Sequence, residues 1–429
     1  MPTTPTTGHA PVDIAIVGAG AAGLATAIFT RRLNPSRSVL LLDSATRPGA
    51  KILVSGGSRC NVTNVAVSER DFSGGKPTII RRVLRAFTAA ETVDWFSSLG
   101  VPLHEEAHGK LFPDSNRSRD VLDALLREAG AAGATLQAGT RVQGVERAGD
   151  AFRLDTPRGA IDASVIVLAT GGQSLPKTGS DGFGFEIARR LGHTVVPTTP
   201  ALVPLIAGPD EPLHQSLSGV AVEVEVSVWI DERVSRRIRG SMLWTHFGVS
   251  GPAILDASRH WLRGQLEQRS VRLTVSFSPG EPFEALDCRV ASLARDRPKA
   301  SAQSMLAEML PASAAAAVLR QAGIDPSTAL ANLPRGDRRR LSHALVEWPL
   351  AVSGSRGYNY AEATAGGVAL DEIDPGTMAS RRCPGLYLVG EILDVDGRIG
   401  GFNFQWAWSS ARAAARALGS DLYFPTLQE

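Results

Sequence analysis

A glycine-rich turn between two apolar segments near the N-terminus most constrains how this chain can fold. Residues 13–17 (DIAIV) form a short apolar run that predicts a buried parallel strand, and the sequence GAGAAG at 18–23 follows it directly. A helical stretch to about Leu33, a second apolar run at 38–42 and then Asp43 complete the unit. This order of strand, glycines, helix, strand and acid predicts a βαβ unit that binds an adenine dinucleotide.

Each glycine of this turn has a physical role in that prediction. Gly18 permits the tight turn, Gly20 lets the backbone approach a pyrophosphate, and Gly23 allows the helix to pack closely on the strand. Free N–H groups at the helix N-terminus attract the phosphates. Asp43 lies 20 positions after Gly23, where a carboxylate accepts hydrogen bonds from a ribose and disfavours a 2′-phosphate. A glycine-rich turn without a ligand is the alternative, and the pattern does not separate NAD from FAD.

Two later apolar runs also end in glycine-containing turns. Residues 164–169 precede the sequence TGG, and residues 385–389 precede Gly390-Glu391. In a doubly wound sheet, ligands lie outside the carboxyl ends of the strands. We therefore expect these turns and the first glycine turn to meet at one crevice. Ordinary punctuation of strands by glycine is the alternative.

The segment DVDGRIGGFN at 394–403 precedes a predicted helix from about Phe404 to Leu418, with Gly419 as its stop signal. The N-terminus of such a helix offers N–H groups and a positive dipole end. In a flavoprotein that end stabilises negative charge on the reduced ring. A helix that only packs against the core is the alternative.

A polar loop is predicted at 51–64 (KILVSGGSRCNVTN), soon after the strand that carries the acid. Its Arg59 and Asn61 have side chains that can grip a pyrophosphate or a flavin edge. By composition alone, an ordinary surface loop is an equal alternative.

The length of 429 residues predicts two or three domains, and the formal charge of +2 argues against a chain built mainly to hold nucleic acid or anionic membranes. Cys60, Cys288 and Cys383 are too far apart in sequence for a local disulfide or a paired-cysteine metal site, so we predict no metal. No apolar run is long enough to span a membrane. Residues 1–10 are expected to be a disordered tail without a signal peptide, and the expected location is the cytoplasm.

The middle of the chain differs in character from both ends. Apolar residues alternate with polar ones over 220–230 and again over 271–277, which predicts half-buried antiparallel strands. An alanine-rich helical pattern follows. The predicted organisation is a discontinuous cofactor domain at 11–193 and 356–429, a β-barrel or sandwich for substrate at 194–280 and 348–355, and a helical subdomain at 281–347.

Six segments carry a family resemblance, and they run in order over nearly the whole chain: DIAIVGAGAAGLATA (13–27), KILVSGGSRCNVTN (51–64), HGKLFPDSNRSRDVLDALL (108–126), VIVLATGGQSLPKTGSDGFGFEIA (165–188), WTHFGVSGPAIL (244–255) and the stretch from TAGGVALDEI to GEILDVDGRIGGFNFQWAWSSA (364–411). They resemble the BaiN-like flavoproteins, FAD-dependent oxidoreductases that include aminoacetone-oxidase-like members. The chain departs from the family pattern at Ser58, where a glycine is common, and at Lys110, where an arginine is common.

The resemblance implies an α/β Rossmann-type fold with non-covalently bound FAD. It implies that the ADP half is held by Gly18, Gly20, Ala21, Ala22, Gly23 and Asp43, with the backbone of Val142 at the adenine. The pyrophosphate and flavin side would be lined by Lys51, Gly57, Arg59, Cys60 and Asn61. The turn that closes over the cofactor would be Ala169, Thr170 and Gly171. The ribityl chain and ring would meet Gly390, Glu391, Asp394, Gly401, Phe402 and Asn403.

The resemblance also implies turnover of a small organic substrate. The near-neutral charge predicts that neither nucleic acid nor a membrane is a partner. NAD(P)H-fed reduction of an activated double bond is the favoured reaction, with NAD(P)H docking transiently as donor. An O₂-dependent amine oxidase releasing peroxide and a non-catalytic flavin sensor are the alternatives. His246 is the candidate proton-transfer residue, because the pKa range of histidine suits that step; a histidine that only fixes a turn is the competing reading. Neither the substrate nor the oligomeric state follows from the sequence.

Overall fold

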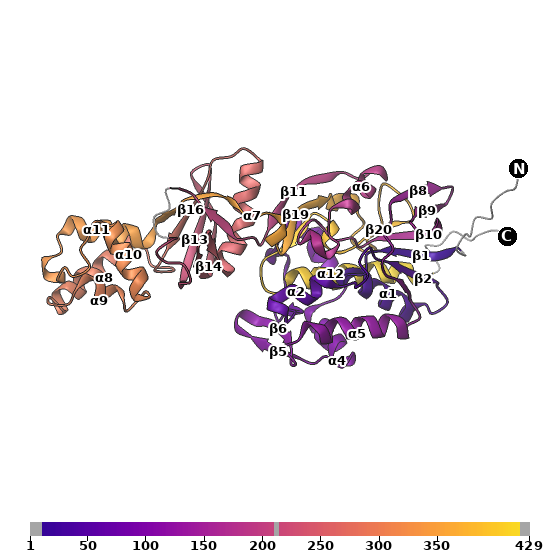
Figure 1. The fold of residues 1–429 in the computed structure, drawn as a ribbon, viewed down its shortest axis with the longest axis horizontal. Helices are drawn as coiled ribbons and strands as arrows, with labels where there is room; N and C mark the ends of the chain where they lie inside the picture. Colours follow the sequence, from indigo (N-terminus) through magenta and orange to yellow (C-terminus); the bar gives the residue numbers. More distant parts are fainter. Residues whose placement is uncertain (1–10, 210–213, 421–429) are drawn as a thin grey trace, which may run out of the picture. The chain divides into compact units, whose positions relative to one another are not determined.

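The computed structural model describes residues 11–209 and 214–420, which form two compact units (Figure 1). Within the described residues, the first unit comprises 11–198 and 362–420, and the second comprises 199–361 without the segment 210–213. The tail predicted at 1–10 lies outside the described residues.

The first unit is built on a seven-stranded sheet in which β7, β2, β1, β10, β9 and β8 follow one another and β20 also pairs with β10. Five strands run parallel to one another: β1 (Val12–Val17), β2 (Val39–Leu42), β7 (Thr135–Gln137), β10 (Ile161–Leu168) and β20 (Leu386–Leu388). The antiparallel strands are β8 (Gly144–Ala148) and β9 (Ala151–Asp155). This arrangement confirms the predicted Rossmann-type α/β fold.

The register of this sheet brings the carboxyl ends of four parallel strands together. Val17 at the end of β1 is paired with Leu42 and with Leu168, and Leu168 is paired with Leu388. These residues are nearly or wholly buried, as expected for strands covered on both faces. The turns that follow the four strands therefore start from one edge of the sheet.

Two long helices with small and aromatic side chains pack on each other in this unit. They are α1 (Ala21–Leu33) and α12 (Phe402–Leu418), and both are buried over most of their length. Trp408 of α12 contributes to an aromatic cluster, with its ring centroid 5.7 Å from that of Trp95 and 5.4 Å from that of Phe96. The helix begins two residues before the predicted start, because Gly401 adopts a left-handed φ of 91° and serves as its N-cap.

The predicted loop at 51–64 begins as a helix in the structure. Helix α2 (Ala50–Ser58) is regular at first, but Ser55, Gly56 and Gly57 depart from helical backbone angles. The departure is caused by left-handed φ values of 54° at Gly56 and 66° at Gly57, which glycine adopts without steric penalty. The prediction of a loop was therefore wrong for the first half of this segment.

The first unit contains further helices and strands. They are β3 (Thr63–Asn64), β4 (Phe72–Gly74), α3 (Pro77–Leu84), α4 (Ala89–Ser98), β5 (Leu103–Glu106), β6 (Lys110–Pro113), α5 (Ser118–Ala131), α6 (Phe183–Arg190), β11 (Val195–Ala201, which ends in the second unit), β19 (Ala363–Val368) and β21 (Val395–Gly397).

The second unit contains a seven-stranded antiparallel sheet and a set of helices. The strands in order across the sheet are β17 (Trp348–Leu350), β16 (Val271–Ser276), β13 (Ala221–Ile230), β14 (Arg233–Thr245), β15 (Gly248–Ser250), β12 (Leu205–Ala207) and β18 (Val352–Ser355). The helices are α7 (Pro252–Leu266), α8 (Phe283–Asp296), α9 (Ala302–Leu306), α10 (Ala312–Gln321) and α11 (Arg335–Val346).

The alternation predicted at 220–230 is present in β13, where Val222, Val224, Val226 and Val228 are buried. The pairing of the described strands runs as an open path from β17 to β18, so closure into a barrel stays a prediction. Helices α8, α10 and α11 share one apolar cluster with the sheet instead of having a core of their own. Among residues 11–209 and 214–420, no helix has the length and apolar character needed to cross a membrane.

A buried acid ties distant parts of the first unit together. Glu372 Oε2 lies 2.9 Å from His193 Nδ1 and accepts a hydrogen bond from the Thr194 N–H at 3.0 Å. Arg382 Nη2 lies 3.0 Å from the other carboxylate oxygen. Burial by itself would raise the pKa of Glu372, but these hydrogen bonds outweigh burial and lower the pKa from 4.5 to about 2.

This depressed pKa predicts an acid-labile contribution to stability. The contribution is present above pH 4.5 and is lost as the pH falls towards 2, and its size is about 3 kcal/mol. Glu372→Gln should therefore lower the free energy of unfolding at pH 7 far more than at pH 3, measured by urea denaturation. Asp150→Asn, at a side chain that is 91% exposed, is the control and should change little at either pH. An equal loss at both pH values for Glu372→Gln would contradict the assignment.

Candidate functional site

The first glycine turn is held against the backbone that leaves β10. Gly18 has a φ of 104°, and a Cβ at this position would lie 2.4 Å from the Ala169 carbonyl oxygen. A Cβ on Gly23 would lie 1.9 Å from the Gly18 oxygen. Both positions therefore require glycine for reasons internal to the protein.

Gly20 is different, and its surroundings suggest a ligand. It has an ordinary extended backbone with a φ of −83°, and no atom lies within 4 Å of a Cβ built on it. Its position at the N-cap of α1 places the free N–H groups of the first helical turn, including those of Ala21, Ala22 and Gly23, beside this open space. The arrangement fits a phosphate-bearing cofactor.

Asp43 follows β2 and organises the adjoining backbone. Its Oδ2 accepts a hydrogen bond from the Ala19 N–H at 2.7 Å, and its Oδ1 accepts one from the Ala45 N–H at 2.8 Å. Burial raises the pKa of this carboxyl, and the two backbone hydrogen bonds oppose that shift. The Thr140 N–H donates to the Asp43 carbonyl oxygen at 2.7 Å, which brings the chain leading to buried Val142 beside the acid.

A polar network connects the turns after β10 and β20. Glu391 accepts hydrogen bonds from Lys51 Nζ at 2.5 Å, from Ser174 Oγ at 2.7 Å and from the Thr364 N–H at 2.9 Å. Lys51 Nζ also donates to Ser174 Oγ at 2.6 Å. The carboxylate thus joins α2, the turn after β10, β19 and the turn after β20. The sequence reasoning named Lys51 and Glu391 but missed Ser174 and Thr364, although both lie in its family-like segments.

The SGGSRCN segment presents its backbone in an unusual conformation. Gly57, Ser58 and Cys60 have φ values of 66°, 67° and 63°. Nothing lies within 4 Å of a Cβ built on Gly57, and Asn61 Oδ1 is buried without a hydrogen-bond partner among the described residues. An open backbone next to an unsatisfied buried oxygen is suited to binding a ligand at this place.

Two side chains of this segment, Arg59 and Cys60, interact with other parts of the protein or are buried in it. Burial raises the pKa of the Cys60 thiol to about 12, so the thiol stays protonated and does not act as a nucleophile. Arg59 Nη1 lies 2.5 Å from Glu106 Oε1, and its guanidinium carbon lies 4.1 Å from the ring centroid of Phe112. The structure thus directs Arg59 to the β5–β6 hairpin.

The residues at the start of α12 are also engaged internally. Phe402 is fully buried, with its ring 6.1 Å from that of Phe72 in an edge-on arrangement. Asn403 accepts from the Gly397 N–H at 2.8 Å and donates to the Gly397 oxygen at 2.9 Å. At this end of α12, the backbone N–H groups of the first turn, beside Gly401, remain available to donate hydrogen bonds to a cofactor.

The residues predicted to contact the cofactor in the turns after β10 and β20 are closely packed against other parts of the protein. A Cβ on Gly390 would lie 2.8 Å from the Ala22 Cβ, and a Cβ on Gly171 would lie 2.6 Å from Ser180 Oγ. Thr170 Oγ1 lies 1.9 Å from the position of a Cβ on Gly184. The carbonyl oxygen of Asp394 accepts from the Gly75 N–H at 2.8 Å.

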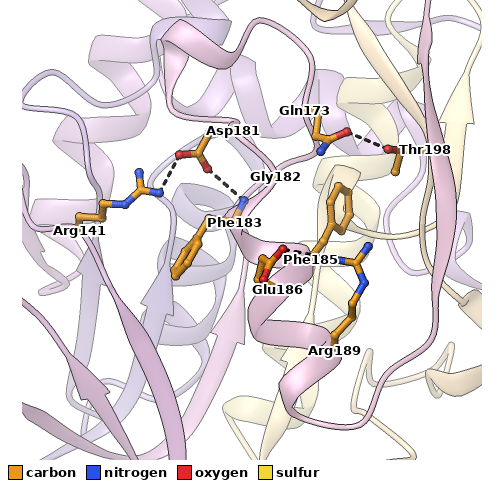
Figure 2. Close-up of a pocket in the computed structure, with 9 residues that line it drawn as sticks. All are labelled: Arg141, Gln173, Asp181, Gly182, Phe183, Phe185, Glu186, Arg189 and Thr198. Atoms are coloured by element: carbon orange, nitrogen blue, oxygen red, sulfur yellow. Dashed lines mark hydrogen bonds and ion pairs between the residues drawn. The ribbon is translucent and has the colours of Figure 1, made fainter.

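A polar pocket of about 340 Å³ opens beside these turns in the first unit (Figure 2). Arg141 forms an ion pair with Asp181 at 2.8 Å and lies 5.0 Å from the ring centroid of Phe183. On the other side, Thr198 Oγ1 donates to Gln173 Oε1 at 2.8 Å. One residue of the pocket wall, Arg141, directly precedes Val142 in the sequence. The sequence analysis did not predict this pocket, because its charged residues come from separate segments of the chain.

His246 belongs to the second unit, in the turn between β14 and β15. The side chain is exposed and its ring packs edge-on against Phe247, with centroids 5.1 Å apart. The catalytic assignment of His246 stays a prediction.

These features fit a bound dinucleotide. The open space at Gly20, the unsatisfied Asn61 oxygen and the open backbone at Gly57 lie in the turns where the pattern predicts the pyrophosphate and flavin. The fold and site together define a dinucleotide-binding protein of the Rossmann type.

The chain belongs to the HI0933-like Rossmann family, whose model matches residues 12–417. This confirms the BaiN-like resemblance and an FAD-dependent oxidoreductase. The chain is 35% identical over 406 residues to the ribosomal RNA dihydrouridine synthase of Escherichia coli, covering 95% of this chain and 98% of that protein. It is 32% identical over 406 residues to the 3-dehydro-bile acid delta(4,6)-reductase of Clostridium scindens, covering 94% and 98%.

Among solved structures, a variant of the E. coli quinol fumarate reductase FrdA aligns with a TM-score of 0.51 at 15% identity, covering 96% of this chain and 70% of that one. At this identity the likeness shows the fold alone.

Gly20→Ala tests whether the open space at this turn is a phosphate site. The apoprotein should keep its free energy of unfolding within about 0.5 kcal/mol, because the backbone angles suit alanine and no atom is near. FAD affinity should fall at least about tenfold, since the methyl group enters the space for the pyrophosphate. Thermal unfolding of the apoprotein and fluorescence titration with FAD check the two parts.

The matched control is Gly130→Ala, because Gly130 lies in α5 and its Cβ position is also open. It should raise stability by up to about 1 kcal/mol and leave FAD affinity unchanged. Equal FAD affinity in Gly20→Ala and Gly130→Ala would show that the open space is not used by the cofactor.

The Lys51–Glu391 pair should contribute to stability as a coupled unit. The side chains are only 25% and 17% exposed, so Lys51→Ala should destabilise the apoprotein by about 1–2 kcal/mol. The double variant Lys51→Ala/Glu391→Gln should lose less than the sum of the single variants in urea unfolding. Arg117→Ala, at a side chain that is 72% exposed in its ion pair with Asp120, is the control and should have little effect. Additive losses would indicate that the two side chains act independently.

Proposed function

We propose that this protein uses FAD and NAD(P)H to reduce a carbon–carbon double bond that is conjugated to a carbonyl group. The observation that carries the proposal is the chemistry shared by the two curated relatives. A dihydrouridine arises when the ring double bond beside a uracil carbonyl is reduced. A delta(4,6)-reductase of a 3-dehydro bile acid acts on double bonds associated with a ketone. Both reactions need hydride delivery to an electron-poor carbon.

The residues of the first unit have defined roles in this proposal. Bound FAD supplies the hydride chemistry. The N-terminus of α12 stabilises negative charge near the flavin with its free N–H groups. Glu391 fixes Lys51 and the turn after β10, so that the cofactor is held in one orientation by a rigid polar network.

The second unit is the proposed substrate domain, with its sheet at 205–355. His246 is the proposed proton donor there, since its side chain is exposed in the turn between β14 and β15 and histidine is a common proton-transfer residue. The conjugated substrate belongs to one of two classes, a uracil base within RNA or a small unsaturated ketone. The near-neutral charge argues for the small molecule, and the 35% identity to the E. coli enzyme argues for RNA.

An anaerobic titration tests the donor part of the proposal. Addition of NADPH or NADH to the FAD-loaded protein should bleach the visible flavin absorption. The reduced protein should then be re-oxidised under anaerobic conditions by an unmodified ribosomal RNA fragment or by a conjugated steroid ketone. Mass spectrometry should show two added hydrogens in whichever substrate reacts.

The control is the saturated product, which should not re-oxidise the flavin. Flavin that no nicotinamide reduces would contradict the proposal. Peroxide release with amines would then identify an oxidase, and its absence would leave a flavin sensor.

A further inference from the structure

An arginine in the second unit packs against one exposed and one half-buried aromatic ring. The guanidinium carbon of Arg356 lies 3.4 Å from the ring centroid of Tyr360 and 4.5 Å from that of Phe247. The His246 ring meets Phe247 edge-on, at an interplanar angle of 84°. Tyr360 is 49% exposed, which is high for a large aromatic side chain. We call these four residues the ring–arginine cluster.

The cluster is assembled from two chain segments that the sheet brings side by side. Phe247 lies in the turn between β14 and β15, and Arg356 directly follows β18. Strand β12 pairs with both β15 and β18, which places the two segments on either side of β12. The Arg356 N–H donates to the Pro204 carbonyl oxygen at 3.1 Å, so the backbone that carries the guanidinium is fixed.

The charge of Arg356 is not neutralised by a carboxylate. Within residues 11–209 and 214–420, Arg356 forms no ion pair, in contrast to Arg239 of the same sheet, which lies 2.6 Å from Glu225. Its positive charge rests on the faces of two rings instead. A planar cation next to the exposed Tyr360 ring suits a ligand that is both flat and negatively charged.

We propose that the ring–arginine cluster binds an unpaired base of a single-stranded RNA segment, with Arg356 also attracting the adjoining phosphate. RNA bases that are not paired are recognised by stacking on Phe, Tyr and His rings and on arginine planes. A conjugated steroid ketone has no aromatic ring to stack on these side chains and no phosphate, so the cluster favours RNA. The inference rests on the proposed function in its RNA form, and it assigns a binding surface in the second unit.

A purely structural role for the cluster makes a different prediction. An arginine that served only to anchor the chain after β18 would be satisfied by one buried ring. Here half of the Tyr360 surface is left to solvent. Replacement of the exposed ring should therefore affect RNA binding more than folding.

Fluorescence anisotropy with the FAD-loaded full chain tests the proposal. The probe is a labelled single-stranded oligouridylate about ten nucleotides long. Arg356→Lys keeps the charge but loses the planar fork, and Tyr360→Leu removes the ring; each should weaken binding about tenfold. Tyr360→Phe keeps the ring and should bind as the wild type does. Arg233→Lys is the control for the loss of a guanidinium elsewhere on the sheet, and it should have no effect.

The binding results for the Arg356 and Tyr360 variants either support or overturn the proposed RNA-binding surface. Weakened binding in Arg356→Lys and Tyr360→Leu, with normal flavin content and melting temperature, supports the surface. Wild-type affinity in both variants, equal affinity for the duplex form of the probe, or no RNA binding by the wild type overturns it. If Arg356→Lys fails to fold, the exposed Tyr360→Leu and Tyr360→Phe pair decides. The measurement needs no turnover, so a failure of the reductase proposal in the nicotinamide titration is recognised separately.

Discussion

The close approach between the first glycine turn and the backbone leaving β10 is the constraint on which the cofactor unit depends. Gly18 has no side chain, so its backbone can lie against Ala169, and the Ala169 N–H donates to the Val17 oxygen at 2.9 Å. This contact aligns the ends of β1 and β10 and sets where α1 begins. The other strand ends follow through the parallel register, since Leu42 and Leu388 pair outward from these two strands.

Glu391 performs a second organising task at the same edge of the sheet. A single carboxylate receives hydrogen bonds from three segments that are distant in sequence, including Lys51 and Ser174. Removing one partner would leave a partly buried charge without compensation, which makes the network cooperative. The hydrogen bonds of Glu391 fix these turns relative to one another, although the turns belong to different helices and strands. Turns fixed in this way are suited to holding an elongated cofactor.

Much of this cofactor unit was predictable because its signals are local. The strands at 13–17 and 38–42 and the glycine turn between them are contiguous and have strong periodic patterns. The start of α12 and the form of 50–58 were not predictable to the residue, because left-handed glycines at Gly56, Gly57 and Gly401 are selected by surrounding backbone rather than by local preference. The pocket lined by Arg141 and Asp181 was not predicted from the sequence for a related reason, since the residues that line it come from separate segments.

The sequence by itself determined the class of cofactor fold and the family. The spacing of the glycines and of Asp43 is what a dinucleotide-binding turn needs, because the glycines allow close backbone approach and the acid accepts hydrogen bonds from a ribose. Only the tertiary structure decided what each side chain does. It paired Arg59 with Glu106, buried Phe402 in the core, and brought Arg356 beside Phe247 from strands that lie on either side of β12. Such pairings depend on strand order and register, which act over distances in the chain that no local pattern encodes.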